Sequence, residues 1–200
     1  EGFEEGRPLG FLDHHLQVGD ALLGLTDLKA LELGIAKDAF KPLSGDHKEV
    51  CKQLAKTNAA ALKDLEKKRN ARAFGQLDVG SQQGSGLTEL QAIEALPENT
   101  TQQIAEKEVA YRNFLHQAKT SRLAHAADLL VGAYLLPKTE GAETLIPTSA
   151  TLYLTLQAVP LPATQQGALA AAQTACADAR VLHWPLAFPQ VFASGGFDCV

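Results

Sequence analysis

The chain has 200 residues, of which 46% are hydrophobic and 20% charged, and its formal net charge is −5. This length can bury a sizeable core, and the composition is that of an ordinary globular protein. No apolar run approaches the roughly 18 residues of a membrane span, and the acidic balance argues against a uniformly basic nucleic-acid-binding protein, although it is compatible with a local basic patch.

The cysteines and the first residues bear on the cellular context. Cys51, Cys176 and Cys199 lie far apart, and no Cys-x-x-Cys spacing occurs. This pattern favours reduced, mostly buried thiols of a cytoplasmic protein over a disulfide framework or a zinc site. The sequence contains no Met and begins without the pattern of a signal peptide. We therefore expect an internal piece of a longer polypeptide, the alternative being a mature domain whose leader has been removed.

The first predicted elements are a short strand and two helices. Residues 16–18 predict a strand that ends at Gly19-Asp20. Thr26 is a candidate N-cap for a short helix over 26–36. Asp46 and Glu49 have the spacing of a capping box and predict a second helix, which runs to about residue 74.

The middle of the chain predicts further helices. Residues 75–86 have the composition of a flexible linker. Thr88 and Gln91 predict the start of a helix that Pro97 ends. A long helical region follows over 100–136, with Thr100 at its start and a break expected at 120–121.

The last quarter of the chain mixes the two kinds of element. Residues 151–157 are ambiguous between strand and helix, and residues 163–179 are Ala-rich and predict a helix. Residues 181–200 predict a return to strand and turn, with a final strand over 197–200. We therefore expect a mainly α fold, in which a helical insertion is flanked by short strands of a doubly wound α/β sheet whose other strands lie outside this chain.

Two features are candidates for binding. Asp20 follows a predicted strand, where ligands bind in doubly wound folds, but a turn or a helix cap explains it equally simply. A lysine face is predicted on one side of the second helix, and such a stripe either tracks a phosphate backbone or is the solvated face of an amphipathic helix. The face consists of Lys48, Lys52, Lys56, Lys63 and Lys67.

Other catalytic signals are missing from the sequence. No nucleophile elbow, P-loop or GxGxxG motif occurs. His14 and His15 are adjacent, so on a strand they would point to opposite faces and could not easily share a metal ion. His183 precedes Trp184-Pro185 in an apolar stretch and is predicted to be a packed corner. We expect neither a metal site nor a catalytic residue in this chain.

The two ends nevertheless resemble a known family. "FLDHHLQVGDALLG" at 11–24 and "HWPLAFPQVFASGGFDCV" at 183–200 are similar to parts of large adenine-specific DNA methyltransferases of restriction-modification and phage-defence systems. In that family a strand ends in Gly-Asp, and a later strand of the form Phe-Asp-x-Val leads into an Asn-Pro-Pro-aromatic motif. Residues 197–200 match the second strand, so the resemblance implies that the catalytic loop follows Val200.

The resemblance implies methyl transfer from S-adenosylmethionine to the exocyclic amine of an adenine that is flipped out of the duplex. Asp20 matches the acidic residue that accepts a hydrogen bond from the adenine amine of the cofactor. The glycine-rich cofactor loop and the Asn-Pro-Pro motif lie outside this chain, so the fragment is expected to be inactive alone. Compact family members place the two strands a short loop apart, whereas residues 26–180 intervene here.

The expected organisation is therefore a partial methyltransferase core at 1–25, a helical insertion at 26–180 and a return to the core at 181–200. The expected partners are DNA, contacted through the full-length parent, and other domains of the same polypeptide. The expected location is the cytoplasm, and no membrane is expected among the partners. The alternative is a helical protein-interaction module without enzymatic activity, in which the helices at 46–74 and 100–136 pair as an antiparallel hairpin.

Overall fold

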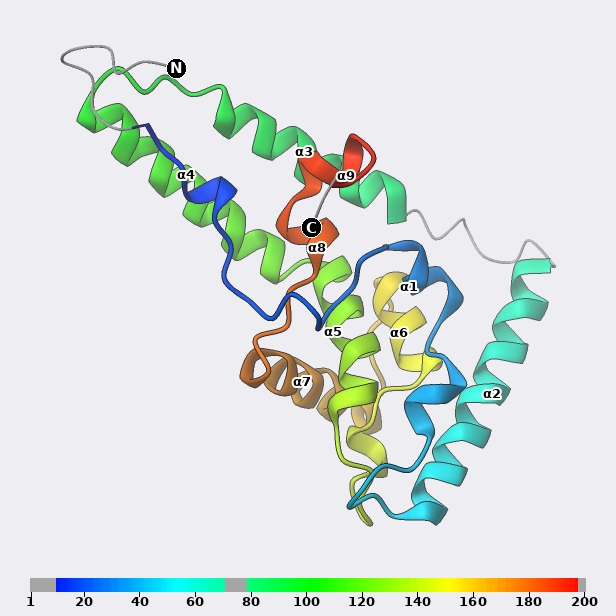
Figure 1. The fold of residues 1–200 in the computed structure, drawn as a ribbon. Coiled ribbons are helices and arrows are strands. Elements are labelled where there is room, and N and C mark those ends of the chain that lie inside the picture. The colour runs from blue at the N-terminus through cyan, green and yellow to red at the C-terminus, as the bar shows by residue number, and fades with distance from the viewer. Residues whose placement is uncertain (1–9, 71–78, 198–200) are drawn as a thin grey trace.

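The computed structural model of the chain describes residues 10–70 and 79–197, and helices make up most of this part (Figure 1). In chain order the elements are the 3-10 helix η1 (Asp13–His15), α1 (Lys29–Leu33), the 3-10 helix η2 (Lys37–Phe40), α2 (Lys48–Asn70), α3 (Val79–Glu94), α4 (Thr101–Lys119), α5 (Arg122–Leu135), the 3-10 helix η3 (Glu143–Leu145), α6 (Ser149–Leu156), α7 (Ala163–Asp178), α8 (Trp184–Ala187) and α9 (Pro189–Ala193). The expectation of a mainly α fold is confirmed.

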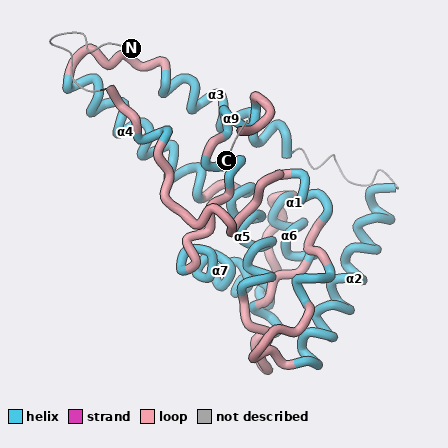
Figure 2. Tube along the Cα trace, in the orientation of Figure 1, coloured by secondary structure: helices cyan, strands magenta, loops and turns pink. Residues whose placement is uncertain are grey.

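The strands that were expected to flank the helices are not seen. The described residues contain only helices and loops, as Figure 2 shows, and their single bridge of β type joins Asp20 and Val181 in parallel. Residues 16–18 form an extended loop. Residues 183–193 form the one-turn helices α8 and α9, in which Pro185 and Pro189 occupy first-turn positions that need no backbone donor. Most of the strand expected over 197–200 lies outside the described residues.

The main body of the molecule is built around α5 (Figure 1). This helix is buried along most of its length because small side chains let its neighbours approach closely. A Cβ atom on Gly132 would lie only 2.5 Å from Cβ of Ala172 on α7. The largest apolar cluster joins α5 to residues from α1, α6, α7 and the preceding loop, namely Leu25, Leu28, Leu31, Leu123, Ala126, Ala127, Leu129, Leu152, Tyr153, Leu156 and Ala172.

A buried polar network fixes α2 and α6 to the loop after α1. The Asn58 side-chain amide donates to the Ile35 carbonyl over 2.8 Å, and its oxygen accepts from the Ser149 backbone N–H over 2.8 Å. The Ser149 hydroxyl in turn accepts from the Ile35 N–H over 2.9 Å. Gly34, at a φ of 77°, brings the chain into this site, where a Cβ atom would lie 2.9 Å from the Ser149 hydroxyl. Each polar group of this buried network therefore has a partner.

The helices α3 and α4 form a hairpin that projects from the main body (Figure 1). A second apolar cluster holds the hairpin together and includes Phe11, Leu90, Ile93, Tyr111 and Phe114. The buried Lys107 ammonium donates to the Glu94 carbonyl at the end of α3 and to the Glu98 carboxylate, over 2.7 and 2.5 Å. A cation at this position complements the negative end of the helix dipole and closes the hairpin.

The predicted start of α4 and the predicted break between α4 and α5 are confirmed. Thr100 caps α4 by accepting from the Gln103 N–H over 3.2 Å. The expected break at 120–121 separates the two helices, and Ser121 caps α5 through the Ala124 N–H. Residues 151–157 were ambiguous from sequence, and all but the last of them belong to the helix α6, while the Ala-rich segment is the helix α7.

Other local predictions are wrong because contacts between distant residues decide the structure. Residues 75–78 of the expected linker lie outside the described residues, and residues 79–86 belong to the helix α3, which packs against α4 through Leu90 and Ile93. The Thr88 hydroxyl lies within that helix and donates to the Gly84 carbonyl. Thr26 does not cap α1, whose N-cap is Leu28.

Asp46 also departs from its predicted role as a helix cap. Its carboxylate accepts from the Leu43 N–H and the Lys138 N–H over 3.0 and 2.9 Å, and so joins the start of α2 to the loop after α5. Burial alone would raise the pKa of Asp46, but these hydrogen bonds and the charge of Lys138 outweigh it and lower that pKa. Burial in turn lowers the pKa of Lys138, whose side chain is buried.

The polar network predicts the effect of removing Asn58. In an Asn58→Leu variant, the Ile35 carbonyl and the Ser149 N–H lose their partners inside the core. We expect the free energy of unfolding to fall by about 2 to 4 kcal/mol, since each buried unpaired group costs roughly 1 to 3 kcal/mol. Urea unfolding followed by circular dichroism measures this change. Thr57→Leu, at the neighbouring exposed position of α2, is the control. Equal unfolding midpoints for the two variants would contradict the role given to the network.

Candidate functional site

Two segments that are far apart in the sequence lie side by side in parallel, and we call this pairing of residues 19–25 with 180–184 the junction. The Asp20 N–H donates to the Arg180 carbonyl over 2.7 Å. The N–H groups of Leu182 and Trp184 donate to the carbonyls of Leu23 and Leu25, both over 3.0 Å. The chain therefore leaves for the helical region and returns from it at one place.

Glycine makes the close contact at the junction possible. Gly24 has a φ of 127°, and a Cβ atom there would lie 2.0 Å from the Leu182 carbonyl oxygen. At Gly19 a Cβ atom would lie 2.9 Å from Cβ of Leu182. A side chain at position 24 would therefore both strain the backbone and separate the two segments.

His183 connects the junction to α5. Its Nδ1 atom accepts from the Leu25 N–H over 3.2 Å, so Nδ1 carries no proton. The proton of the neutral ring is therefore on Nε2, which donates to Asp128 Oδ1 over 3.2 Å. The side chains of His183 and Asp128 are only 10% and 19% exposed. The predicted packed corner is thus a histidine whose two ring nitrogens are both engaged.

Cys176 lies beside this pair but is not prepared for nucleophilic catalysis. Its thiol donates to the Asp128 carbonyl over 3.6 Å. Burial, together with the charge and the hydrogen bonding of the Asp128 side chain, raises the pKa of Cys176 to about 12. The thiol is therefore protonated at neutral pH, and no free nitrogen of His183 can activate it. This Cys-His-Asp group holds the structure together and does not form a catalytic triad.

A cavity of about 490 Å³ opens beside the junction and is walled by α4, α5, α7 and residues 180–187. Leu115, Leu182 and Leu186 contribute apolar side chains to its lining, and Lys119 and Arg180 contribute cations. Arg180 has a φ of 52°, in the left-handed region that glycine favours. Hydrogen bonds from Arg180 and Val181 to the carbonyls of Ala177 and Cys176 end α7 in a Schellman motif around this residue.

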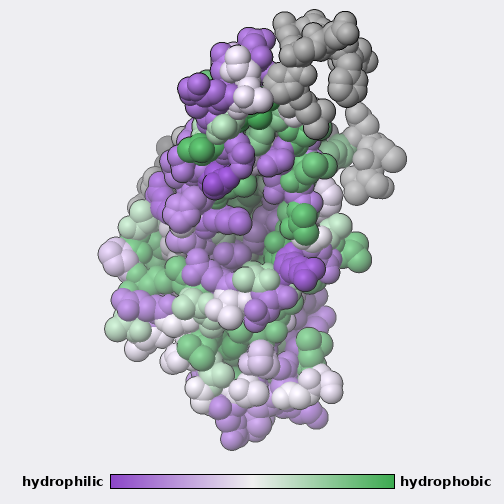
Figure 3. Space-filling view, turned by 90° about the vertical axis from the view of Figure 1, so that its left-hand side faces the viewer, coloured by the Kyte–Doolittle hydropathy of each residue, from purple (hydrophilic) through white to green (hydrophobic). Residues whose placement is uncertain are grey.

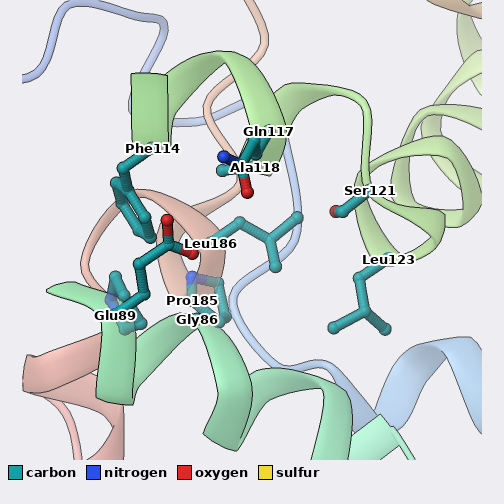
Figure 4. Close-up of a pocket in the computed structure, with 10 residues that line it drawn as sticks. Gly86, Glu89, Phe114, Gln117, Ala118, Ser121, Leu123, Pro185 and Leu186 are labelled. Atoms are coloured by element: carbon teal, nitrogen blue, oxygen red, sulfur yellow. The ribbon is translucent and has the colours of Figure 1, made fainter. Parts of the chain in front are cut away.

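A smaller cavity of about 200 Å³ lies between the hairpin and the main body (Figure 4). Glu89 of α3 and Phe114 of α4 border it on the hairpin side, while Leu123 of α5 and Leu186 of α8 border it on the body side. Leu186 lines both cavities, and so does Ala118. The molecular face in Figure 3 mixes hydrophilic and hydrophobic residues and is hollowed near its middle.

Asp20 lies at the junction but not at the end of a formed strand. Its Oδ1 atom accepts from the Leu22 N–H over 2.9 Å, which closes a turn two residues long, and its side chain is exposed. Of the two simple explanations for this residue, the structure therefore has the turn and not the helix cap.

The lysine face lies on the solvent side of α2. Its members Lys48, Lys52, Lys56, Lys63 and Lys67 are all exposed. The opposite side of α2 is buried through Val50, Cys51, Leu54 and Asn58. Lys52 lies 3.7 Å from the exposed Glu49 carboxylate, an ion pair that water screens. The amphipathic character predicted from the sequence is thus present, with the lysines on the exposed side of the helix.

Metal and membrane signals do not occur in the part of the chain that the structure describes. No group of three or more His, Cys, Asp or Glu residues there is placed to hold a metal ion. None of the described helices combines the length and the apolar character that crossing a bilayer requires. Comparison of the chain with protein-family models, with curated proteins and with solved structures finds no match.

The pairing of Asp128 with His183 at the junction was not predicted from the sequence, although one sequence feature indicates that Asp128 has a buried partner. Asp128 is the only acidic residue between Arg122 and Leu135, a segment rich in Ala and Leu. An isolated carboxylate in such a helix indicates a buried partner. Nothing in the sequence, however, indicates that the partner is His183.

The junction predicts the effect of replacing His183. In a His183→Phe variant, the Leu25 N–H and the Asp128 carboxylate both lose a partner. We expect the free energy of unfolding to fall by about 2 to 3 kcal/mol. Thermal and urea unfolding measure this fall, and His116→Phe, at an exposed position of α4, is the control. A His183→Phe variant as stable as the control would show that the histidine does not hold the junction.

Proposed function

We propose that this chain belongs to an S-adenosylmethionine-dependent DNA adenine methyltransferase of a restriction or phage-defence system. In this proposal residues 26–180 are a helical insertion between two segments of the methyltransferase core. The observation that carries the proposal is the junction. Asp20, in the stretch at 11–24 that resembles the family, pairs there in parallel with Val181, which lies two residues before the stretch at 183–200. Parallel pairing of this kind is what neighbouring strands of a doubly wound sheet would form.

The proposed roles follow from where the residues lie. Asp20 would accept a hydrogen bond from the adenine amine of the cofactor, and its exposed carboxylate at the junction leaves it accessible for this role. The base pocket would be supplied by an Asn-Pro-Pro-aromatic loop beyond the Phe-Asp-x-Val sequence. We assign no catalytic residue to the chain itself, and we expect the 200 residues alone to be inactive.

The lysine face would contact the DNA backbone beside the flipped base. Five exposed cations along one side of α2 form a stripe that can follow successive phosphates. The contact would be independent of sequence, because phosphates position a protein on DNA without specifying bases. This role would explain how an insertion on an acidic protein contributes to DNA binding.

A helical protein-interaction module remains the second candidate, and the projecting α3–α4 hairpin is the observation that favours it. The expected pairing of the helices at 46–74 and 100–136 is replaced by the pairing of α3 with α4. In this candidate the hairpin would bind a partner helix, and the junction would only close the fold.

Methyl transfer separates the two candidates. The gene is expected to encode Asn-Pro-Pro followed by an aromatic residue shortly after Val200. The polypeptide that the gene encodes around this chain should transfer a tritiated methyl group from S-adenosylmethionine to adenine in DNA. Labelled N6-methyladenine is the readout. Unrelated sequence after Val200, together with the absence of transfer, would favour the interaction module.

The role of Asp20 is tested in the same longer polypeptide. Asp20→Ala should weaken S-adenosylmethionine binding by about tenfold, the effect of losing roughly 1.4 kcal/mol of interaction. Isothermal titration calorimetry measures the affinity. Asp27→Ala is a matched control, because Asp27 is also exposed and also accepts from the N–H two residues on. If the two variants bound S-adenosylmethionine with equal affinity, Asp20 would not be part of the cofactor site.

Charge reversal tests the lysine face. A variant with Lys52→Glu, Lys56→Glu and Lys63→Glu should bind DNA more weakly. A plot of the logarithm of its affinity against the logarithm of the salt concentration should be less steep by about two to three. Each lost phosphate contact removes roughly 0.9 from the magnitude of this slope. Fluorescence anisotropy over a range of salt concentrations measures both. The matched control reverses Lys29, Lys37 and Lys41, which are exposed on other elements. An equal loss of DNA affinity in the control variant would show that overall charge, and not the lysine face, causes the effect.

A further inference from the structure

The larger cavity beside the junction has the make-up of a small-molecule site. Its volume of about 490 Å³ lies within the range of roughly 300 to 1,000 Å³ that is usual for ligand pockets. Val18, Leu115, Leu182 and Leu186 contribute aliphatic side chains to its lining. Ligand pockets are mostly apolar and hold a few polar groups that orient the ligand. The size and the lining of this cavity therefore suit a small molecule with an apolar body.

Two cations in the lining have no partner of their own. Lys119 is the last residue of α4, Arg180 follows the end of α7, and both are exposed. In the part of the chain that the structure describes, neither side chain forms a hydrogen bond or an ion pair. Asp128 also lines the cavity, but its carboxylate accepts from Nε2 of His183. The described lining thus offers two unpaired cations beside an apolar surface.

The fold itself does not require an arginine at position 180. Its φ of 52° lies in the region that glycine adopts most easily, and glycine is the usual residue at this position of a Schellman motif. Ala158, with a φ of 56°, ends α6 with the same pattern of hydrogen bonds and carries no charge. The motif therefore needs no cation, and the Arg180 side chain is left to serve the cavity that it lines.

We propose that this cavity binds a small amphiphilic anion, a molecule with an aliphatic body and one carboxylate or phosphate head. The body packs on the aliphatic lining and is removed from water. Lys119 and Arg180 hold the head, and the arginine can donate two parallel hydrogen bonds to either kind of head. The inference stands apart from the proposed methyltransferase, because neither cation has a role in methyl transfer or in the lysine face.

Probes that share one aliphatic chain and differ in the head group test the binding. Octanoate, octyl phosphate, octanol and octylamine are titrated into the 200-residue chain by isothermal titration calorimetry. The two anions should bind at least about tenfold more tightly than octanol, and octylamine should bind most weakly. The tighter of the two anions identifies the preferred head. Binding of neither anion, or equal affinities for octanoate and octanol, would overturn the proposal.

Removing either cation tests how the head group is held. Arg180→Gly and Lys119→Gln should each weaken octanoate binding by about tenfold and leave octanol binding unchanged. Glycine suits the left-handed backbone at position 180, so the thermal unfolding midpoint of that variant should not fall. Arg122→Gln, at an exposed arginine outside the lining, is the control. A lower midpoint with unchanged octanoate affinity would show that the cations only complement the ends of the helices.

Filling the cavity tests where the aliphatic chain lies. Ala177 is exposed on α7 and lines the cavity, so Ala177→Phe should occupy part of the space and weaken the binding of octanoate and octanol alike. Ala170→Phe, at an exposed position of the same helix outside the lining, should change neither affinity. Equal affinities of these two variants for octanoate would place its binding outside the cavity and refute the proposal.

Discussion

The parallel pairing of residues 19–25 with 180–184 is the constraint on which the rest of the structure depends. Because the two segments are paired, the part of the chain between them must begin and end at the same place in the molecule. Gly24 permits the contact, and His183 fixes it to α5 through Asp128. The two paired segments overlap only the ends of the stretches at 11–24 and 183–200. The helical region can therefore be long without separating them.

Between the two paired segments, the fold is stabilised by close helix packing and by buried polar groups that have hydrogen-bond partners. The contact between Gly132 and Ala172 lets α5 and α7 approach closely, and an apolar core forms around it. Asn58 is a buried polar residue of the main body and Lys107 is one of the hairpin, and each ties together neighbouring segments of the chain. The lysine face, by contrast, adds little to the packing and is free to serve a partner.

Sequence reasoning succeeded where the signal is local. Thr100 caps α4 as predicted, the break expected at 120–121 separates α4 from α5, and the amphipathic pattern placed the lysines of α2 in solvent. It failed where distant residues decide. Asp46 has the spacing of a cap, but the N–H of Lys138 takes its carboxylate, and the glycines before Leu90 belong to a helix held by its contacts with α4. For the candidate site, the Gly-Asp sequence indicated the turn that Asp20 closes, and the binding role of Asp20 stays a prediction, whereas the pairing of His183 with Asp128 had no sequence signal.

The two-residue break between α4 and α5 has a mechanical consequence. Lys107 and Glu98 lock α3, α4 and the segment around Phe11 into one unit, and only the short stretch at Thr120 and Ser121 continues the chain from α4 into α5. The hairpin is also held by α9, which packs against α3, so the break at these residues is not its only tie to the main body. Both cavities border the break through Ala118. A change in the angle between α4 and α5 would therefore alter the width of both cavities at once.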